Sequence, residues 1–315
     1  MTQVSQAPWG EVPGQGVVHL WLLQSPQLQV EILTLGATIK SVFSRGRDGR
    51  SADVVLGYDH LQAGYLSDRR YLGATVGRVA NRIAKGLFVV DGVQYKLDTN
   101  NGPNAIHGGL QGFSKALWRA EAVDAGVQLS LTSPDGDQGY PGELHVSLTY
   151  TLKGAPDIYD HQVSISAQWY LPVDDTSIPT GDIRPVEGTL FDLRKPVLLG
   201  PRLKELPGPG FDHNFCLCAS KDVWKERRAA RVVHPASGRV LEVWTSQPGL
   251  QFYTANYLDG SVVGKGGVPY GKHSSFCLET QNWPDAVNQP TFPNCLLQAG
   301  EQYHHVTRLS FTTAP

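Results

Sequence analysis

The chain has 315 residues, of which 41% are hydrophobic and 18% charged, and its formal net charge is −2 at pH 7. This hydrophobic content excludes a disordered chain. The nearly balanced charge argues against nucleic acid or an anionic membrane surface as a partner, because both need a basic face. The longest apolar runs, such as Val17–Leu23, are too short to cross a bilayer. We therefore expect a globular protein with a small, neutral partner.

The first residues lack the charged and then apolar order of a secretory signal. Four cysteines in a chain of this size do not indicate a disulfide framework, so a cytoplasmic location is the simplest expectation. The pattern His213-x-x-Cys216-x-Cys218 invites a metal-site interpretation, but it lacks a second ligand pair at a usual zinc spacing. Buried, unreactive thiols explain this pattern better.

Short runs of β-branched and aromatic residues, punctuated by 34 glycines and 21 prolines, predict an all-β fold. The segment Phe88–Leu97 predicts a hairpin, because Asp91 and Gly92 suit the positive φ angles of a two-residue type I′ turn. Alternating apolar and polar residues predict further strands at 145–150, 162–167, 250–253 and 306–311.

Helical patterns are sparse. The best candidate for a helix is Lys221–Arg231, whose five basic residues indicate a solvated surface. No long linker, low-complexity tract or fixed-period repeat interrupts the chain. We predict a large antiparallel β-sandwich that forms a single domain over residues 1–315.

Asn81 and Arg82 lie in a segment bounded by Gly77 and Gly86, just before the predicted hairpin. An arginine donates several hydrogen bonds in a fixed geometry, which suits sugar hydroxyls or a carboxylate. A surface arginine with a solvated head group is the simpler interpretation from these residues alone.

His107 and Asp212 are two further candidates in loops. Gly108 and Gly109 follow His107 and leave the backbone open to close approach by a ligand, although a histidine that only satisfies a turn fits equally well. The turn residues 207–210 present Asp212 at the start of an apolar strand, where its carboxylate could accept hydrogen bonds from sugar hydroxyls. A turn-capping aspartate is the common alternative.

The strongest local signal is the segment 275–285. Phe276 and Leu278 are expected to face the core, which places Glu279 on the opposite face, at the end of the strand. Trp283 follows in a loop, and a carboxylate beside aromatic surface is partly desolvated, which raises its pKa toward the range of a general base. The alternative is a surface glutamate on an edge strand.

Taken in chain order, these segments resemble the aldose 1-epimerase family. The similarity runs from about Trp9 to Phe311 and rests on 53–58, 77–86, 106–109, 133–136, 139–144, 170–174, 210–215 and 279–288. The resemblance implies the supersandwich fold of galactose mutarotase-like proteins with an open sugar cleft, no metal and no cofactor. It further implies a free aldohexose, galactose or glucose, as the small-molecule partner of a monomer, with no nucleic acid and no membrane involved.

The resemblance also assigns roles to individual residues. It implies that Glu279 is the general base that takes the proton of the C1 hydroxyl. It implies that the sugar ring and its hydroxyls are held by Asn81, Arg82, His107, Asp212 and Gln251. Interconversion of the two anomers then needs an acid that protonates the ring oxygen, so that the C1–O5 bond breaks while the base acts.

The chain departs from the family at this acid. The family's acid is a histidine in an Asn-x-Thr-Asn-His motif that should follow the strand ending near residue 152, and this chain has no such motif. The sequence indicates an internal deletion of hairpin size near 152–157. His161 does not replace the acid, because its surroundings match a later family segment.

Positioned acid and base groups each contribute about 10²–10⁴ in rate, so loss of the acid predicts a very slow enzyme. Loss of strands from a sheet also exposes unpaired backbone groups. A non-catalytic sugar-binding or regulatory protein and an unstable product are therefore the alternatives. A sugar-phosphate epimerase is less well supported, because the site segments show no dedicated basic cluster for a phosphate.

Overall fold

The computed structural model describes residues 2–25, 28–151, 161–217 and 225–314. Within these ranges the chain is built of antiparallel strands, with four larger sheets and three two-stranded ones. The predicted all-β class is confirmed. The predicted deletion near 152–157 lies outside the described residues, between the end of one sheet's last strand and the start of another sheet.

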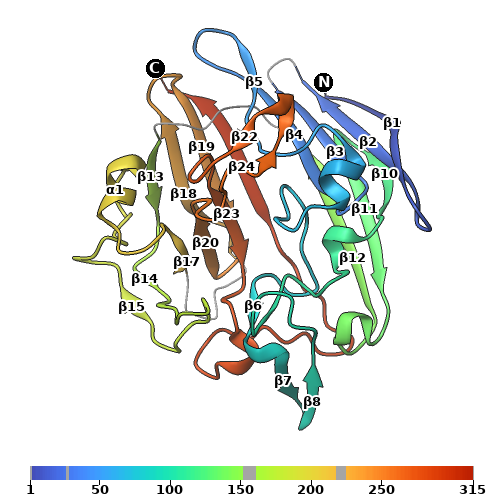
Figure 1. The fold of residues 1–315 in the computed structure, drawn as a ribbon, viewed down its shortest axis with the longest axis vertical. Coiled ribbons are helices and arrows are strands. Elements are labelled where there is room, and N and C mark those ends of the chain that lie inside the picture. The colour runs from blue at the N-terminus through green and yellow to red at the C-terminus, as the bar shows by residue number, and fades with distance from the viewer. Residues whose placement is uncertain (1, 26–27, 152–160, 218–224, 315) are drawn as a thin grey trace.

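The N-terminal half forms two sheets (Figure 1), and they share one core. The first contains, in chain order, β1 (Gln3–Val12), β2 (Gly16–Gln24), β3 (Leu28–Leu33), β4 (Thr38–Arg45) and β5 (Ser51–Asp53). The second contains β10 (Arg119–Val123), β11 (Gly126–Ser133) and β12 (Leu144–Thr151). Trp21 and Ile32 of the first sheet pack in one buried cluster with Val127 and Leu129 of the second. Burial of apolar side chains between the sheets therefore holds this half together.

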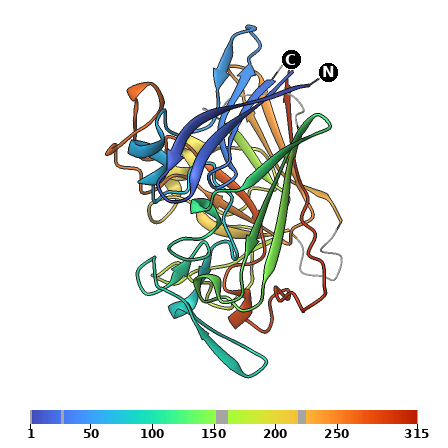
Figure 2. The same cartoon turned by 90° about the vertical axis from the view of Figure 1, so that its right-hand side faces the viewer.

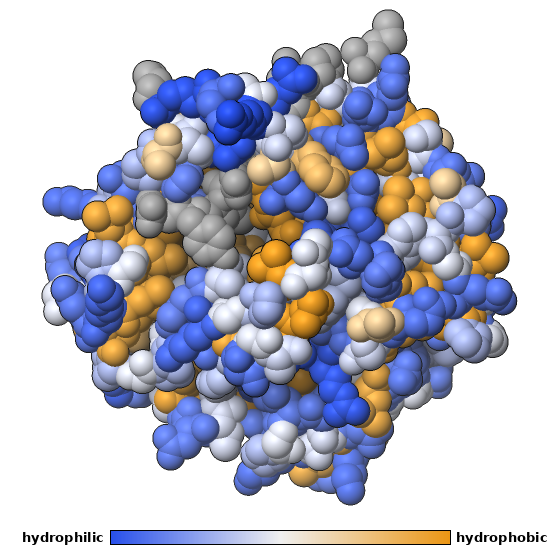
Figure 3. All heavy atoms as spheres, turned by 45° about the horizontal axis from the view of Figure 1, so that its top comes forward, coloured by the Kyte–Doolittle hydropathy of each residue, from blue (hydrophilic) through white to orange (hydrophobic). Residues whose placement is uncertain are grey.

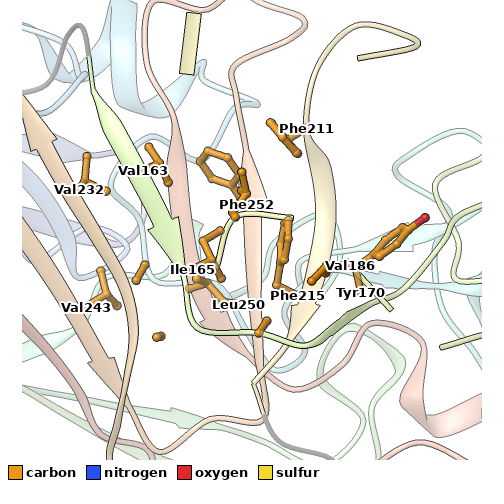
Figure 4. Close-up of a cluster of buried hydrophobic side chains, with 14 of the residues drawn as sticks. Val163, Ile165, Tyr170, Val186, Phe211, Phe215, Val232, Val243, Leu250 and Phe252 are labelled. Carbon is orange, nitrogen blue, oxygen red and sulfur yellow. The ribbon is translucent and has the colours of Figure 1, made fainter. Parts of the chain in front are cut away.

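The C-terminal half is a sandwich of two five-stranded sheets. The order of the outer sheet is β16 (Val197–Leu198), β13 (Gln162–Ile165), β18 (Arg227–His234), β19 (Arg239–Thr245) and β24 (Thr307–Thr313). The order of the inner sheet is β15 (Arg184–Pro185), β14 (Trp169–Tyr170), β17 (Asp212–Cys216), β20 (Gly249–Tyr253) and β23 (Cys277–Gln281). Figure 4 shows Phe215, Leu250 and Phe252 of the inner sheet facing Val163 and Ile165 of the outer sheet. This apolar core fixes the inner sheet, whose other face carries the candidate site.

The remaining elements are shorter. The two-stranded sheets are β6 (Arg82–Ile83) with β9 (Ala105–Ile106), β7 (Leu87–Val90) with β8 (Val93–Lys96), and β21 (Val262–Val263) with β22 (Pro269–Tyr270). The helix α1 spans Leu199–Glu205, and short helical turns occupy 61–66, 84–86, 113–115, 137–139, 265–267 and 286–288. Among the described residues no helix is both long and apolar enough to span a membrane.

The two ends of the described chain lie at the same end of the molecule (Figures 1 and 2). Figure 3 shows one face, on which hydrophobic patches alternate with hydrophilic residues rather than forming a continuous band. Singly exposed apolar side chains such as Val89 and Leu198 are normal for a folded protein of this size.

Most predicted strands are present. The hairpin forms as predicted, with φ of 51° at Asp91 and 77° at Gly92. The other four predicted strands correspond to β12, β13, β20 and β24, although β13 ends at residue 165 rather than 167. The predicted helix at 221–231 is wrong for residues 227–231, which belong to β18 and pair with β13 and β19, while its part at 221–224 lies outside the described residues. Burial of Ala230 and Val232 in the sandwich core favours a strand over a solvated helix.

Candidate active site

Three neighbouring strands place polar side chains on one face of the inner sheet. In the register, Gln251 of β20 lies opposite Asn214 of β17 on one side and opposite Glu279 of β23 on the other. Asp212 lies two residues before Asn214 and therefore points to the same face. The register thus brings Asp212, Gln251 and Glu279 together, although they are far apart in the sequence.

The opposite face of these strands packs into the sandwich core. Phe276 and Leu278 lie against the core cluster, as the alternation around Glu279 predicts. Contrary to the sequence prediction, Glu279 does not end its strand but lies in the middle of β23 with two strand residues on each side, and it is only partly exposed. β23 is the edge strand of its sheet among the described residues, as the alternative interpretation expects, but Glu279 is buried enough to raise its pKa and is not a solvated surface side chain.

Asp212 connects the sheet with the loops that cover it. The Gln251 amide Nε2 donates a hydrogen bond to Asp212 Oδ1 at 2.8 Å. The other carboxylate oxygen, Oδ2, lies 3.9 Å from Nη2 of Arg82, and the side chains of Arg82 and Asp212 are only 12% and 18% exposed. The interpretation of Arg82 as a surface residue with a solvated head group is therefore wrong, and its charge lies over the polar face of the sheet.

Hydrogen bonds between Asn81 and His107 hold the loop side of the site. Asn81 has a φ of 63°, a left-handed conformation that asparagine tolerates better than most residues. Its backbone N–H donates to His107 Nδ1 at 3.2 Å, and the His107 N–H donates to the Asn81 carbonyl at 3.1 Å. The Asn81 side-chain oxygen accepts the N–H of Arg82 at 2.9 Å. These contacts place Asn81, Arg82 and His107 in one unit.

The hydrogen bond to Nδ1 also decides the protonation of His107. Since Nδ1 accepts, the ring proton of neutral His107 resides on Nε2. Burial, assisted by the nearby positive charge of Arg82, lowers the pKa of His107 to about 4. At neutral pH this imidazole is therefore an uncharged hydrogen-bond donor and does not have the proton affinity of a general acid.

The structure explains why a glycine follows His107 at position 108. A Cβ on Gly108 would lie 1.7 Å from the carbonyl oxygen of Gly77, and Gly108 has a φ of 80°. The group that approaches this backbone closely is thus another part of the chain. Only glycine fits between the two segments.

The Glu279 carboxylate has the electrostatics of a base poised near neutral pH. Burial is the main cause that raises its pKa to about 7, and the negative charge of Asp212 adds to the rise, whereas Arg82 opposes it. Burial and the negative charges of Glu279 and Asp212 also raise the pKa of the neighbouring Cys277 thiol, which stays protonated. A carboxylate of this pKa can both take and return a proton at pH 7.

The remaining sulfur and imidazole candidates lie outside this arrangement. The His213 ring packs 4.6 Å from the Phe191 ring, and Cys216 is a buried free thiol, while Cys218 lies outside the described residues. Among the residues that the structure describes, no group of three potential ligands could hold a metal ion. His305 is exposed and contacts Thr280, which alternates with Glu279 and so points to the other face of β23.

Two residues that support the site have no role assigned from the sequence alone. Asn101 accepts a hydrogen bond from Nε of Arg82 at 2.8 Å through its side-chain oxygen. Asp285 follows β23 and contacts the backbone on both sides of Ile83, at the Arg82 carbonyl and the Ala84 N–H. Asp285 lies within the segment 275–285 of the strongest local signal and within the segment 279–288 that carries the family resemblance, but neither feature assigned it a role.

Together, the raised pKa of a carboxylate and the surrounding fixed donors define a β-sandwich protein suited to proton exchange on a small, polar, uncharged molecule. A family model described as aldose 1-epimerase matches residues 19–156 and 153–310. Galactose mutarotases from Bos taurus and Homo sapiens are 52% and 51% identical over the full length of both chains. Aldose 1-epimerase from Escherichia coli K12 is 32% identical over 95% of this chain and 96% of its own. The chain belongs to the aldose 1-epimerase family.

Solved structures agree with this assignment. An aldose epimerase homologue from C. elegans superimposes with a TM-score of 0.84 at 26% identity, and each chain is covered completely. Galactose 1-epimerase from Lactobacillus acidophilus superimposes with a TM-score of 0.79 at 23% identity over all of both chains, which shows the fold. The predicted β-sandwich of the galactose mutarotase type is confirmed.

Proposed function

We propose that this chain binds a free aldohexose, galactose or glucose, and interconverts its α and β anomers by acid–base ring opening. The observation that carries the proposal is the Glu279 carboxylate with a pKa of about 7, set on the polar face of the inner sheet beside Asp212 and Arg82. Glu279 takes the proton of the C1 hydroxyl as the C1–O5 bond breaks, and the leaving ring oxygen takes a proton from solvent water, because the family's acid histidine is absent. The open aldehyde then turns about C1–C2. As the ring closes on the other face, the C5 hydroxyl returns its proton to solvent and Glu279 returns its proton to the C1 oxygen.

The other site residues bind the sugar in this proposal. Arg82 and the Nε2–H of neutral His107 donate hydrogen bonds to ring hydroxyls, and Asp212 accepts them. Gln251 orients Asp212 through the 2.8 Å hydrogen bond. Asn81 contributes mainly by holding His107 and Arg82 in place. A sugar is a suitable ligand because its hydroxyls both donate and accept, as this set of groups requires.

We further propose that catalysis is weak, because the chain lacks the histidine that should protonate the ring oxygen. The sequence has no Asn-x-Thr-Asn-His motif. The alignments with the mammalian relatives extend over 346 positions, whereas the chain has 315 residues, and the two matches to the family model meet at 153–156. His107 cannot take over the role efficiently, because its pKa of about 4 leaves it unprotonated at neutral pH.

Polarimetry of freshly dissolved α-galactose tests both parts of the proposal. We expect a rate above that of the Glu279→Gln variant, but about 10²–10⁴ below that of an intact family member measured in parallel. Imidazole buffer should raise the rate of the unmodified protein, because imidazolium can supply the missing proton. The Glu279→Gln variant in the same buffer corrects for catalysis by imidazole in solution. A rate equal to that of the intact relative without imidazole would contradict the missing acid.

The absent motif also favours a second candidate, a sugar-binding protein without catalysis. Calorimetry separates the two functions. A binding protein would be identified by two results. The unmodified protein binds galactose and Arg82→Ala does not, and the mutarotation rate of the unmodified protein does not exceed that of Glu279→Gln even in imidazole. If the protein unfolds cooperatively but shows no galactose binding and no rate enhancement, both candidates are refuted.

A further inference from the structure

The strand that carries Arg82 has only one strand partner. β6 pairs with β9, where Arg82 lies opposite Ile106. On its other side, the loop after β23 takes the place of a strand. The Asp285 N–H donates to the Arg82 carbonyl at 3.1 Å, and the Ala84 N–H donates to Asp285 Oδ1 at 3.0 Å. A single residue from the loop that follows Glu279 thus satisfies the backbone on both sides of residue 83.

Asp285 is itself held firmly. It is 4% exposed and adopts a left-handed conformation with φ of 56°. The side-chain amide of Asn288 donates to the same Oδ1 at 2.7 Å. The nearby Trp283 is buried, and its Nε1–H donates to the Pro248 carbonyl at 3.0 Å. The acceptor therefore has little freedom to follow β6 if the strand moves.

The guanidinium of Arg82 depends on this backbone support. Its closest approach to Asp212 is 3.9 Å, which is too long for a hydrogen bond, and its Nε bonds to the side chain of Asn101 in a solvent-exposed contact. Neither contact ties the arginine tightly to the inner sheet. The backbone of β6 must therefore define how far the positive charge lies from Glu279.

We propose that Asp285 is a positioning residue that fixes Arg82 relative to Glu279 and so couples the loop side of the site to the strand that carries the base. The effect on sugar binding rests on the proposed function. The effect on the Glu279 carboxyl does not, because it follows from the distance between two charges.

The expected electrostatic effect has a definite sign. Glu279 is faced by Asp212 from β17, by Arg82 from β6 and by the neutral thiol of Cys277 on its own strand. Asp212 raises the pKa of Glu279 and Arg82 lowers it. If Arg82 withdraws while Asp212 stays on the sheet, the pKa of Glu279 must rise.

Asp285→Gly and Asp285→Asn provide the test. Glycine accepts the positive φ but removes the acceptor, whereas asparagine keeps both. Carboxyl ¹³C NMR follows the titration of Glu279, whose signal is assigned by its loss in Glu279→Gln. We expect the midpoint to rise by about half a pH unit in Asp285→Gly and to stay unchanged in Asp285→Asn. Asp91→Gly, the same substitution at φ of 51° in the exposed hairpin turn, is the matched control and should leave the midpoint unchanged.

Galactose calorimetry is the second measurement, with a loss of affinity of about 3- to 10-fold expected in Asp285→Gly alone. If Asp285→Gly does not fold, Asn288→Ala replaces it, because this variant removes the amide that holds the Asp285 carboxylate, and a smaller rise is expected. An unchanged midpoint in the folded variant would overturn the proposal, as would an equal rise in Asp285→Asn. If the unmodified protein binds no galactose, the proposed function fails, but the titration still decides the role of Asp285.

Discussion

The two sides of the site are held in place by different kinds of interaction. Asp212, Gln251 and Glu279 sit on three paired strands, so the register of one sheet fixes them together. Asn81, Arg82 and His107 sit on two-residue strands and turns, where separate hydrogen bonds between side chains and backbone hold each one. The sheet side therefore resists single substitutions outside its core, whereas the loop side depends on individual contacts. In the proposed reaction the sheet side supplies the base and the loop side supplies donors.

Glu279→Gln should give the largest effect and tests whether the sheet side carries the chemistry. Glutamine has nearly the same shape but cannot accept a proton, so the residual rate of mutarotation should fall by about 10²–10⁴ or to the uncatalysed background. Galactose binding should persist, because the sugar-binding groups are unchanged. Polarimetry together with calorimetry measures both quantities. Full activity in this variant would show that another residue is the base.

Arg82→Ala should have the next largest effect and tests the loop side. Loss of a charged donor weakens galactose binding by about 10- to 100-fold, since hydrogen bonds to charged groups contribute about 1.5–3 kcal/mol. Arg82→Lys keeps the charge but loses the planar fork, so an intermediate affinity is expected. Calorimetry measures the affinity. An alanine variant that binds galactose normally would show that Arg82 only supports the structure.

The same division explains what could be predicted from the sequence. The alternation of Phe276, Leu278 and Glu279 is local, and it correctly predicted which face Glu279 occupies. The burial of Arg82 could not be derived from its neighbours, because it results from contacts with Asp212 and Asn101. Asp285 and Ala84 are 201 residues apart in the chain, and no periodic pattern records such a contact.

The fold shows the same limit. Strands with a clear period of two and the Asp91-Gly92 turn were predictable from local chemistry. The segment 227–231 was not, because its basic residues suggest a solvated helix while its partners β13 and β19 impose a strand. Local pattern decides an element only where distant partners do not compete with it.

The pH dependence of stability sharpens the comparison on the sheet side. The pKa of Glu279 is about 7 in the folded state and 4.5 ordinarily, so the folded protein holds this proton more tightly than the unfolded chain. Its contribution to stability is present below pH 4.5 and is lost as the pH rises through 7.

Glu279→Gln should therefore be more stable than the unmodified protein at pH 8, by at most about 3 kcal/mol, and equally stable near pH 4. Denaturant unfolding at several pH values measures the difference. Asp91→Asn, at an exposed position in the hairpin turn, is the control, and its stability difference from the unmodified protein should not change in this way with pH. A stability difference that does not change with pH would mean that Glu279 titrates normally.

The smallest effect is expected for Asn101→Ala. This variant removes the acceptor of the Arg82 Nε–H, a hydrogen bond that is exposed to solvent and therefore contributes only about 0.5–1 kcal/mol. Galactose affinity should fall by about 2- to 5-fold, and Asn101→Asp, which restores an acceptor, should recover it. Calorimetry under the conditions used for Arg82→Ala makes the two values comparable. If Asn101→Ala lowers galactose affinity as much as Arg82→Ala, the loop side acts as one cooperative unit. The loop side would then differ from the sheet side in the kind of contact that holds it, and not in having independent contacts.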